Sequence, residues 1–196
     1  MAEVLWMLAA YLLGSVPFGL VFARYAHGVD PREAGSGNIG ATNVARLCGF
    51  GWGICTLVCD LGKGLAAAGI ALHINPNAVF VTLVSLAVVA GHRWSCFMGF
   101  QGGKAVATSI GVFLTLAFWQ TFAALILCVG CILRSGFVSV GSLAFVASLP
   151  FLLVLTGVWR FVPLALVVAA VIIKAHEVNI LRLLSGEEKS WKKGKS

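Results

Sequence analysis

Six long apolar runs, separated by short polar stretches, make up most of this chain. They cover residues 4–23, 50–72, 78–91, 105–133, 137–158 and 161–184. Runs of this length and composition are typical of helices that cross a membrane, because a helix satisfies its own backbone hydrogen bonds without water. The pattern therefore predicts an all-α, polytopic integral membrane protein.

The composition supports this class. Of the 196 residues, 60% are hydrophobic and only 11% are charged, which is more apolar than a soluble domain of this size needs. The formal net charge is +7. In a membrane protein such a charge points to orientation and to anionic lipid headgroups rather than to nucleic acid. The first residues carry no basic segment and no small-residue cleavage site, so we expect no removable signal peptide.

The run at 105–133 could cross the membrane once or twice. A single crossing gives six spans and places the basic tail opposite the other basic loops. Two crossings, with a turn near Trp119 and Gln120, give seven spans and leave only Arg160 among the basic groups outside. Because basic residues concentrate on the cytoplasmic side, the sequence predicts seven transmembrane helices, with the N-terminus outside and the C-terminus cytoplasmic.

This topology forms one domain, 1–196, with three polar segments on the cytoplasmic side: 24–49, 92–104 and 176–196. The tail lysines Lys189, Lys192, Lys193 and Lys195 belong to the last of these segments. Several of the seven spans fall short of the ~20 residues that a crossing needs. Parts of the polar segments are therefore expected at membrane depth, which is tolerated where they are buried in protein or line a wet cavity.

A glycine-rich turn with one lysine runs from Gly99 to Thr108 and leads directly into an apolar run. Glycine amides, a helix N-terminus and the charge of Lys104 together favour a seat for a phosphate group. The spacing is not the Walker pattern, because Ala105 rather than Ser or Thr follows the lysine. The alternative is a flexible connection between two helices.

A second polar stretch, residues 35–46, offers hydroxyls, side-chain amides, glycine N–H groups and Arg46, but no carboxylate. That inventory suits an anion with several oxygens. The alternative is an ordinary polar loop before a short helix. Arg93, in the next polar segment, is explained as well by an orientation charge as by a ligand contact.

Two further polar pairs lie inside apolar runs. Asp60 and Lys63 share a helix face and can neutralise each other, either at a site or as a buried pair that fixes helix packing. His176 and Asn179 share a face near the inner end of the last span. A lone histidine there is often structural, but ionisable groups in a membrane bundle are also candidates for function.

The sequence offers little for metal or cysteine chemistry. The seven acidic residues include no pair or triplet typical of a two-metal phosphotransfer site, and no Cys and His set has zinc spacing. The six cysteines, including the Cys128-x-x-Cys131 pair, are interpreted as small buried hydrophobes. We therefore expect no metal and no cofactor, and a site that stabilises phosphate by donors and cations alone.

Four motifs together resemble the bacterial acyl-phosphate:glycerol-3-phosphate acyltransferase family. They are Ser36–Asn43 with Arg46; Asp60, Lys63 and Gly64; Gly91–Trp94 with Phe100–Thr108; and His176, Glu177 and Asn179. The resemblance covers essentially the whole chain, in order. It implies a seven-span enzyme of the bacterial inner membrane, with its active site at the cytoplasmic face.

The implied reaction transfers an acyl group from acyl-phosphate to the 1-hydroxyl of sn-glycerol 3-phosphate. The products are lysophosphatidic acid and phosphate, the first step of phospholipid synthesis. Neither acyl-CoA nor acyl-carrier protein is the implied donor. Other glycerol-phosphate acyltransferases carry a catalytic H-x-x-x-x-D, and none of the four histidines here has Asp five positions on.

The resemblance also implies roles for residues. Ser36, Thr42 and the amides of Gly102 and Gly103 would hold the phosphoryl group of the donor. Glycerol 3-phosphate would be held, and its hydroxyl aimed, by four residues: Arg46, Lys104, His176 and Asn179. Asn38 and Asn43 complete the expected substrate-binding set, and Ser36, Lys104, His176 and Asn179 are the expected catalytic residues. The base is either His176 or a substrate phosphate.

Two other classes remain as alternatives. A small-anion or phosphate transporter would use the same donors along a path, but the expected outer turns are poor in polar residues. A structural membrane subunit would use the polar motifs as contacts between helices. The one-sided polarity favours an enzyme whose partners are acyl-phosphate, glycerol 3-phosphate and membrane lipid.

Overall fold

A computed structural model describes residues 1–191 and shows only helices there, joined by turns and loops. The tail residues Lys192, Lys193 and Lys195, which we expect on the cytoplasmic side, lie outside the described residues. The helices are α1 (Ala2–Ser15), α2 (Phe18–His27), α3 (Ala41–Cys48), α4 (Phe50–Ile74), α5 (Ala78–Arg93), η1 (Cys96–Met98), α6 (Val106–Leu116), α7 (Phe118–Ser135), α8 (Val138–Leu155), η2 (Trp159–Phe161), α9 (Val162–Ala175) and α10 (Glu177–Leu184).

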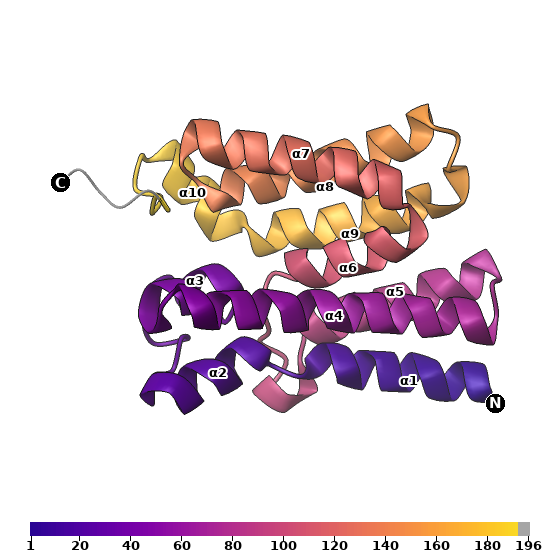
Figure 1. Ribbon diagram of the computed structural model, residues 1–196, viewed down its shortest axis with the longest axis horizontal. Helices are drawn as coiled ribbons and strands as arrows, with labels where there is room; N and C mark the ends of the chain where they lie inside the picture. The colour runs from indigo at the N-terminus through magenta and orange to yellow at the C-terminus, as the bar shows by residue number, and fades with distance from the viewer. Residues whose placement is uncertain (192–196) are drawn as a thin grey trace. The chain divides into compact units, whose positions relative to one another are not determined.

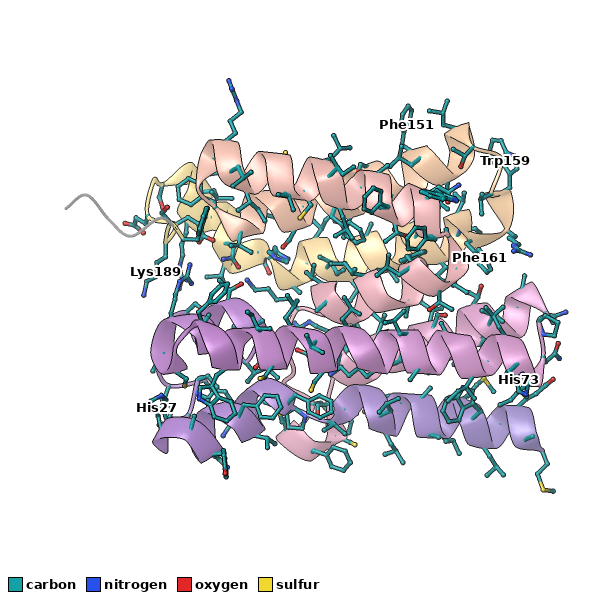
Figure 2. All side chains as sticks on the ribbon, viewed as in Figure 1. His27, His73, Phe151, Trp159, Phe161 and Lys189 are labelled. Atoms are coloured by element: carbon teal, nitrogen blue, oxygen red, sulfur yellow. The ribbon has the colours of Figure 1, made fainter. Side chains whose placement is uncertain are left out.

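These helices form two compact units. Unit 1 is Met1–Thr115 and unit 2 is Leu116–Ser196, described as far as residue 191. In unit 1, α4 runs alongside α1 and α2; in unit 2, α7, α8 and α9 lie side by side (Figure 1). Figure 2 shows His27 and His73 at opposite ends of unit 1, and Lys189 at the end of unit 2 away from Trp159.

Among the described residues 1–191, five helical stretches are long and apolar enough to cross a membrane: 2–27, 50–74, 78–98, 118–135 and 138–155. A sixth is the pair Trp159–Ala175 and Glu177–Leu184, bent by 59°. The prediction of an all-helical integral membrane protein is confirmed. The run at 105–133 is not one helix, because it divides at Ala117 into the short α6 and the longer α7.

The helices of unit 1 approach closely where glycines remove side chains. A Cβ at Gly14 would overlap the carbonyl of Val88, and one at Gly91 would overlap the carbonyl of Tyr11. These reciprocal contacts bring the backbones of α1 and α5 together. Small residues let membrane helices pack at van der Waals distance, where lipid supplies no hydrophobic drive for association.

A break between α1 and α2 interrupts the predicted span 4–23. Pro17 lacks an N–H and disrupts the helix, which frees carbonyls in the preceding turn. The buried ammonium of Lys63 donates to the carbonyls of Gly14 at 2.9 Å and Val16 at 3.2 Å. The hydroxyl of Ser95 donates to the carbonyl of Ser15 at 2.6 Å. The break is therefore capped by side chains from two other segments of unit 1.

In unit 2 a second break occurs at His176, between α9 and α10. The predicted run 161–184 is therefore divided into two helices that meet at His176, and the shared face of His176 and Asn179 stays a prediction. The segment after α10 folds back, and the hydroxyl of Ser190 and the amide of Trp191 both donate to the carbonyl of Gly136. Gly136, with φ 80°, forms the turn between α7 and α8.

Gly64 and Gly62 provide a matched test of the close packing in unit 1. A Cβ at Gly64 would overlap the carbonyl of Thr108 in α6, whereas a Cβ at Gly62, on the same helix, meets nothing within 4 Å. Gly64→Ala should lower the free energy of unfolding by about 1–3 kcal/mol, because two backbones must separate. Gly62→Ala should not lower it. Thermal unfolding in detergent checks this, and equal melting temperatures for the two variants would contradict the α4–α6 contact.

Candidate active site

The polar loop between α2 and α3 is organised by Asn43. Its buried side-chain amide donates to the carbonyls of Pro31, Ala34 and Asn38, at 2.9–3.1 Å. Its Oδ1 accepts the backbone N–H of Ser36 at 2.8 Å. Asn43 is 2% exposed. The side chain of Asn43 thus holds the loop in shape, and its expected contact with substrate stays a prediction.

Asp30 fastens the start of the same loop. Its carboxylate lies 2.6 Å from the guanidinium of Arg32 and 3.0 Å from that of Arg24. The hydrogen bond from Arg32 holds the pKa of Asp30 well below its usual range. Because the folded state lowers this pKa, the stability it contributes is fully present at neutral pH and is lost only in strong acid. The ion pairs of Asp30 with Arg24 and Arg32 therefore persist over the physiological pH range.

The other candidate site residues of this stretch are more exposed to solvent than Asn43. Ser36, Asn38 and Thr42 are half-buried, and Arg46 is exposed in the last turn of α3. The Oδ1 of Asn38 accepts the N–H of Gly40 at 2.8 Å, a local turn contact. The loop therefore displays hydroxyl, amide and guanidinium groups around the rigid core that Asn43 makes.

The glycine-lysine turn is tied back to the end of α5. The N–H of Gly102 donates to the carbonyl of Arg93 at 2.9 Å, and the N–H of Gly103 donates to the carbonyl of His92 at 3.0 Å. Both amides are thus used within the turn, and a contact of either one with a phosphate stays a prediction. A Cβ at either glycine would overlap His92 or Arg93, so this approach requires glycine.

Two residues without glycine's freedom border this turn in left-handed conformations. Phe100 has φ 63° and Ala105 has φ 61°. Such angles cost of order 1–3 kcal/mol for non-glycine residues and occur where surrounding structure enforces them, often at functional sites. Lys104 lies immediately before Ala105, which is buried. The enforced backbone therefore fixes where the Lys104 side chain leaves the chain.

A buried polar network connects α4, α5 and α6 next to the glycine-lysine turn. Lys63 pairs with Asp60 at 2.9 Å, and the Nδ1 of His92 lies 3.6 Å from the same carboxylate oxygen. That nitrogen is also hydrogen-bonded to the hydroxyl of Thr108 at 3.0 Å. All four side chains are buried. The interpretation of Asp60 and Lys63 as a pair that fixes helix packing is supported, and the pair reaches the glycine-lysine turn through His92.

A small apolar cluster joins the two motif loops of unit 1. Leu20 of α2, Ile39 of the Asn43-held loop and Met98 of η1 form one buried group. Gly19 allows this approach, because a Cβ there would overlap the carbonyl of Ile39. Figure 1 shows η1 beside the break between α1 and α2. The polar loop and the segment that carries Lys104 are thus parts of one packed arrangement.

In unit 2, His176 lies at the break between α9 and α10, and Asn179 lies in the first turn of α10. The Nδ1 of the buried His176 is 2.8 Å from the carbonyl of Ile172. A carbonyl only accepts, so Nδ1 carries the hydrogen and Nε2 is the basic nitrogen of the neutral ring. The Nδ2 of Asn179 donates to Glu188 at 2.7 Å. Nearby, the ammonium of Lys174 forms an exposed ion pair with the carboxylate of Glu177 at 2.7 Å.

Sequence reasoning gave no role to four residues that the structure connects to these motifs: His92, Thr108, Ser139 and Glu188. His92 could have been suspected, since an ionisable group within an apolar run is usually paired. Ser139 and Glu188 are far apart in the chain, and nothing in the pattern links them. In residues 1–191 no three His, Cys, Asp or Glu side chains gather as a metal site.

The distinction between organising and contacting residues can be tested in the first loop. Asn43→Ala removes four hydrogen bonds from a buried position and should lower the free energy of unfolding by about 2–3 kcal/mol. Ser36→Ala alters a half-buried hydroxyl and should leave stability unchanged while activity falls. Thermal unfolding and turnover measured on both variants check this. Equal stability of Asn43→Ala and wild type would contradict the role given to Asn43.

Comparison with known proteins finds relatives that match nearly the whole chain. The family model described as glycerol-3-phosphate acyltransferase matches residues 4–186. The glycerol-3-phosphate acyltransferase of Desulfovibrio desulfuricans is 59% identical over 196 residues, covering 100% of this chain and 88% of that protein. The protein of the same name from Lawsonia intracellularis is 48% identical, covering 99% of this chain and 98% of its own length.

Two solved structures match the fold of this chain. The crystal structure of PlsY (YgiH), an integral membrane glycerol 3-phosphate acyltransferase, in its glycerol 3-phosphate form matches with a TM-score of 0.94 and 36% identity, covering 97% of this chain and 96% of that chain. The lysophosphatidic acid form matches with a TM-score of 0.91, at 36% identity, covering 97% and 95%. The motif residues, the helical membrane architecture and these matches lead to one conclusion: the chain belongs to the glycerol-3-phosphate acyltransferase family.

Proposed function

We propose that the protein transfers an acyl group from acyl-phosphate to the 1-hydroxyl of sn-glycerol 3-phosphate, which gives 1-acyl-glycerol 3-phosphate and phosphate. The observation that carries the proposal is the match over nearly the whole chain to PlsY in both its glycerol 3-phosphate and lysophosphatidic acid forms. One ligand is the proposed acceptor and the other is the proposed product. In a bacterium this reaction begins phospholipid synthesis.

The residues divide between two anion seats. Ser36, on the loop that Asn43 holds, and Thr42, in the first turn of α3, bind the phosphoryl group of the donor, with Asn38 beside Ser36 in the proposed seat. Arg46 and Lys104 supply the cations, and Lys104 is placed by the constrained turn that Gly102 and Gly103 make possible. Fixed donors and cations of this kind stabilise charge without reorganising during reaction. His176 and Asn179 hold glycerol 3-phosphate and aim its hydroxyl.

The chemical step is an acyl substitution. The 1-hydroxyl oxygen attacks the acyl carbon, and the bond from that carbon to the phosphate oxygen breaks. The departing phosphate keeps the electron pair of that bond. The hydroxyl proton leaves to Nε2 of His176 or to a phosphate oxygen of the substrate. Phosphate is a good leaving group, so positioning and charge stabilisation supply most of the rate.

The proposed reaction uses neither a metal nor an organic cofactor, because cations and hydrogen-bond donors of the chain hold both phosphates. The acyl chain, being apolar, lies between helices that face lipid. Nucleic acid has no part in the reaction. The basic residues act on phosphate substrates and on anionic headgroups of the membrane.

The proposed topology is seven spans in the bacterial inner membrane, with the N-terminus outside and the C-terminus cytoplasmic. In this arrangement α6, although short, makes one crossing together with the turn before it. The polar segments 24–49, 92–104 and 176–196 then share the cytoplasmic side, where the soluble substrate glycerol 3-phosphate is made. We propose that residues 1–196 form a single acyltransferase domain. The distribution of basic residues supports this orientation.

The function is tested with purified protein in lipid, supplied with glycerol 3-phosphate and either acyl-phosphate or acyl-CoA. Phosphate release and 1-acyl-glycerol 3-phosphate should appear with acyl-phosphate only. Lys104→Ala should lower kcat/KM by about 10²–10³, the range for losing one charge-stabilising group, without changing the melting temperature. Arg134→Ala, which removes an exposed cation from α7, is the matched control and should retain activity.

Turnover with acyl-CoA alone would contradict the proposed donor. No turnover with either donor, in protein that unfolds cooperatively at the normal temperature, would contradict the enzyme. Phosphate flux measured in sealed liposomes then distinguishes a transporter that uses the same anion seats.

A further inference from the structure

Glu188 lies in the segment after α10, and the proposed reaction gives this residue no role. Its Oε1 accepts two hydrogen bonds, one from Nδ2 of Asn179 and one from Oγ of Ser139, each 2.7 Å long. The carboxylate is half-buried and Ser139 is 5% exposed. Hydrogen bonds to an ionised carboxylate are shorter and stronger than those between neutral groups.

This contact fixes which way the amide of Asn179 faces. An ionised carboxylate only accepts hydrogen bonds, so the atom of Asn179 that meets it must be the nitrogen, which is a donor. The amide oxygen therefore lies on the other branch of the side chain. Without the carboxylate, the amide could rotate by half a turn and exchange its donor and acceptor, since the terminal torsion of asparagine is broad.

The segment that carries Glu188 is itself held in place. The amides of Glu187 and Glu188 both donate to the carbonyl of Arg182, which closes the end of α10. Beyond Glu188, the Ser190 hydroxyl and the Trp191 indole donate to carbonyls at the end of α7, at 2.9 and 3.4 Å. The segment thus crosses from α10 to the α7–α8 turn, with Glu188 between its two attachments.

Ser139 completes the arrangement from the other side. It lies in the first turn of α8, three residues after Gly136, and its hydroxyl holds the same carboxylate oxygen that Asn179 meets. Both donors therefore converge on one atom. That geometry leaves the carboxylate a single preferred position, and the position decides the orientation of the Asn179 amide.

We propose that Glu188 and Ser139 are positioning residues for the acyl acceptor: they hold the amide of Asn179 so that its oxygen accepts the 2-hydroxyl of glycerol 3-phosphate. The proton of the reacting 1-hydroxyl then stays available to the base. The inference rests on the proposed function, in which Asn179 contacts glycerol 3-phosphate. The carboxylate does not touch substrate. It acts through Asn179 alone, and so it affects the acceptor and not the donor.

The test is steady-state kinetics with both substrates varied. Glu188→Ala should raise KM for glycerol 3-phosphate about tenfold, with KM for acyl-phosphate unchanged, because a charge-assisted hydrogen bond to the amide is lost. Glu188→Gln keeps an acceptor oxygen and should recover most of the affinity. Ser139→Ala should act in the same direction, about threefold. Glu187→Ala removes the adjacent exposed carboxylate and should match wild type in both constants.

The double variant Ser139→Ala with Glu188→Ala adds a second measurement. Because Ser139 acts through Glu188, the double variant should be no worse than Glu188→Ala, whereas independent effects would multiply. Equal rises in both KM values, a wild-type KM in Glu188→Ala, or multiplied effects would each overturn the inference. Absence of turnover in the wild type would instead overturn the proposed function, so the two failures are distinct.

Discussion

The structure of unit 1 depends on one buried ammonium group. Lys63 neutralises Asp60 and also donates to two carbonyls that the break at Pro17 leaves without helical partners. A buried charge is tolerated only when it is paired and fully hydrogen-bonded. The break would expose backbone polar groups to an apolar surrounding without this cap. Lys63 therefore lets α1 and α2 change direction inside a membrane.

The same network reaches the segment that carries Lys104. The carboxylate of Asp60 lies near His92, and the backbone of His92 holds Gly103. The turn is then forced into left-handed conformations at Phe100 and Ala105. A phosphate site needs its cation at a fixed place, because charge stabilisation depends on groups that do not move during reaction. A pair that fixes helix packing thus also lies beside the turn that carries Lys104.

Much of this could be predicted from sequence, and the failures have physical causes. The all-helical membrane class followed from the apolar runs, and the Asp60–Lys63 pair followed from helical spacing. The sequence did not reveal that the amides of Gly102 and Gly103 donate to the chain's own carbonyls, because glycine enables close backbone approach of any kind. It also did not reveal that Asn43 holds its own loop, because an amide in a polar loop can bind a ligand or the loop itself. The contact between Glu188 and Ser139 joins residues 49 apart, which local patterns do not specify.

Lys63 is a structural cap and not a ligand for phosphate. The most direct test is the thermal unfolding of Lys63→Met in detergent, with substrate KM values measured on the folded protein. Lys63→Met should lower the free energy of unfolding by about 3–5 kcal/mol, because Asp60 is left buried and without its cation. KM for both substrates should stay near wild type. A variant with normal stability that no longer binds glycerol 3-phosphate would contradict the account and place Lys63 in the site itself.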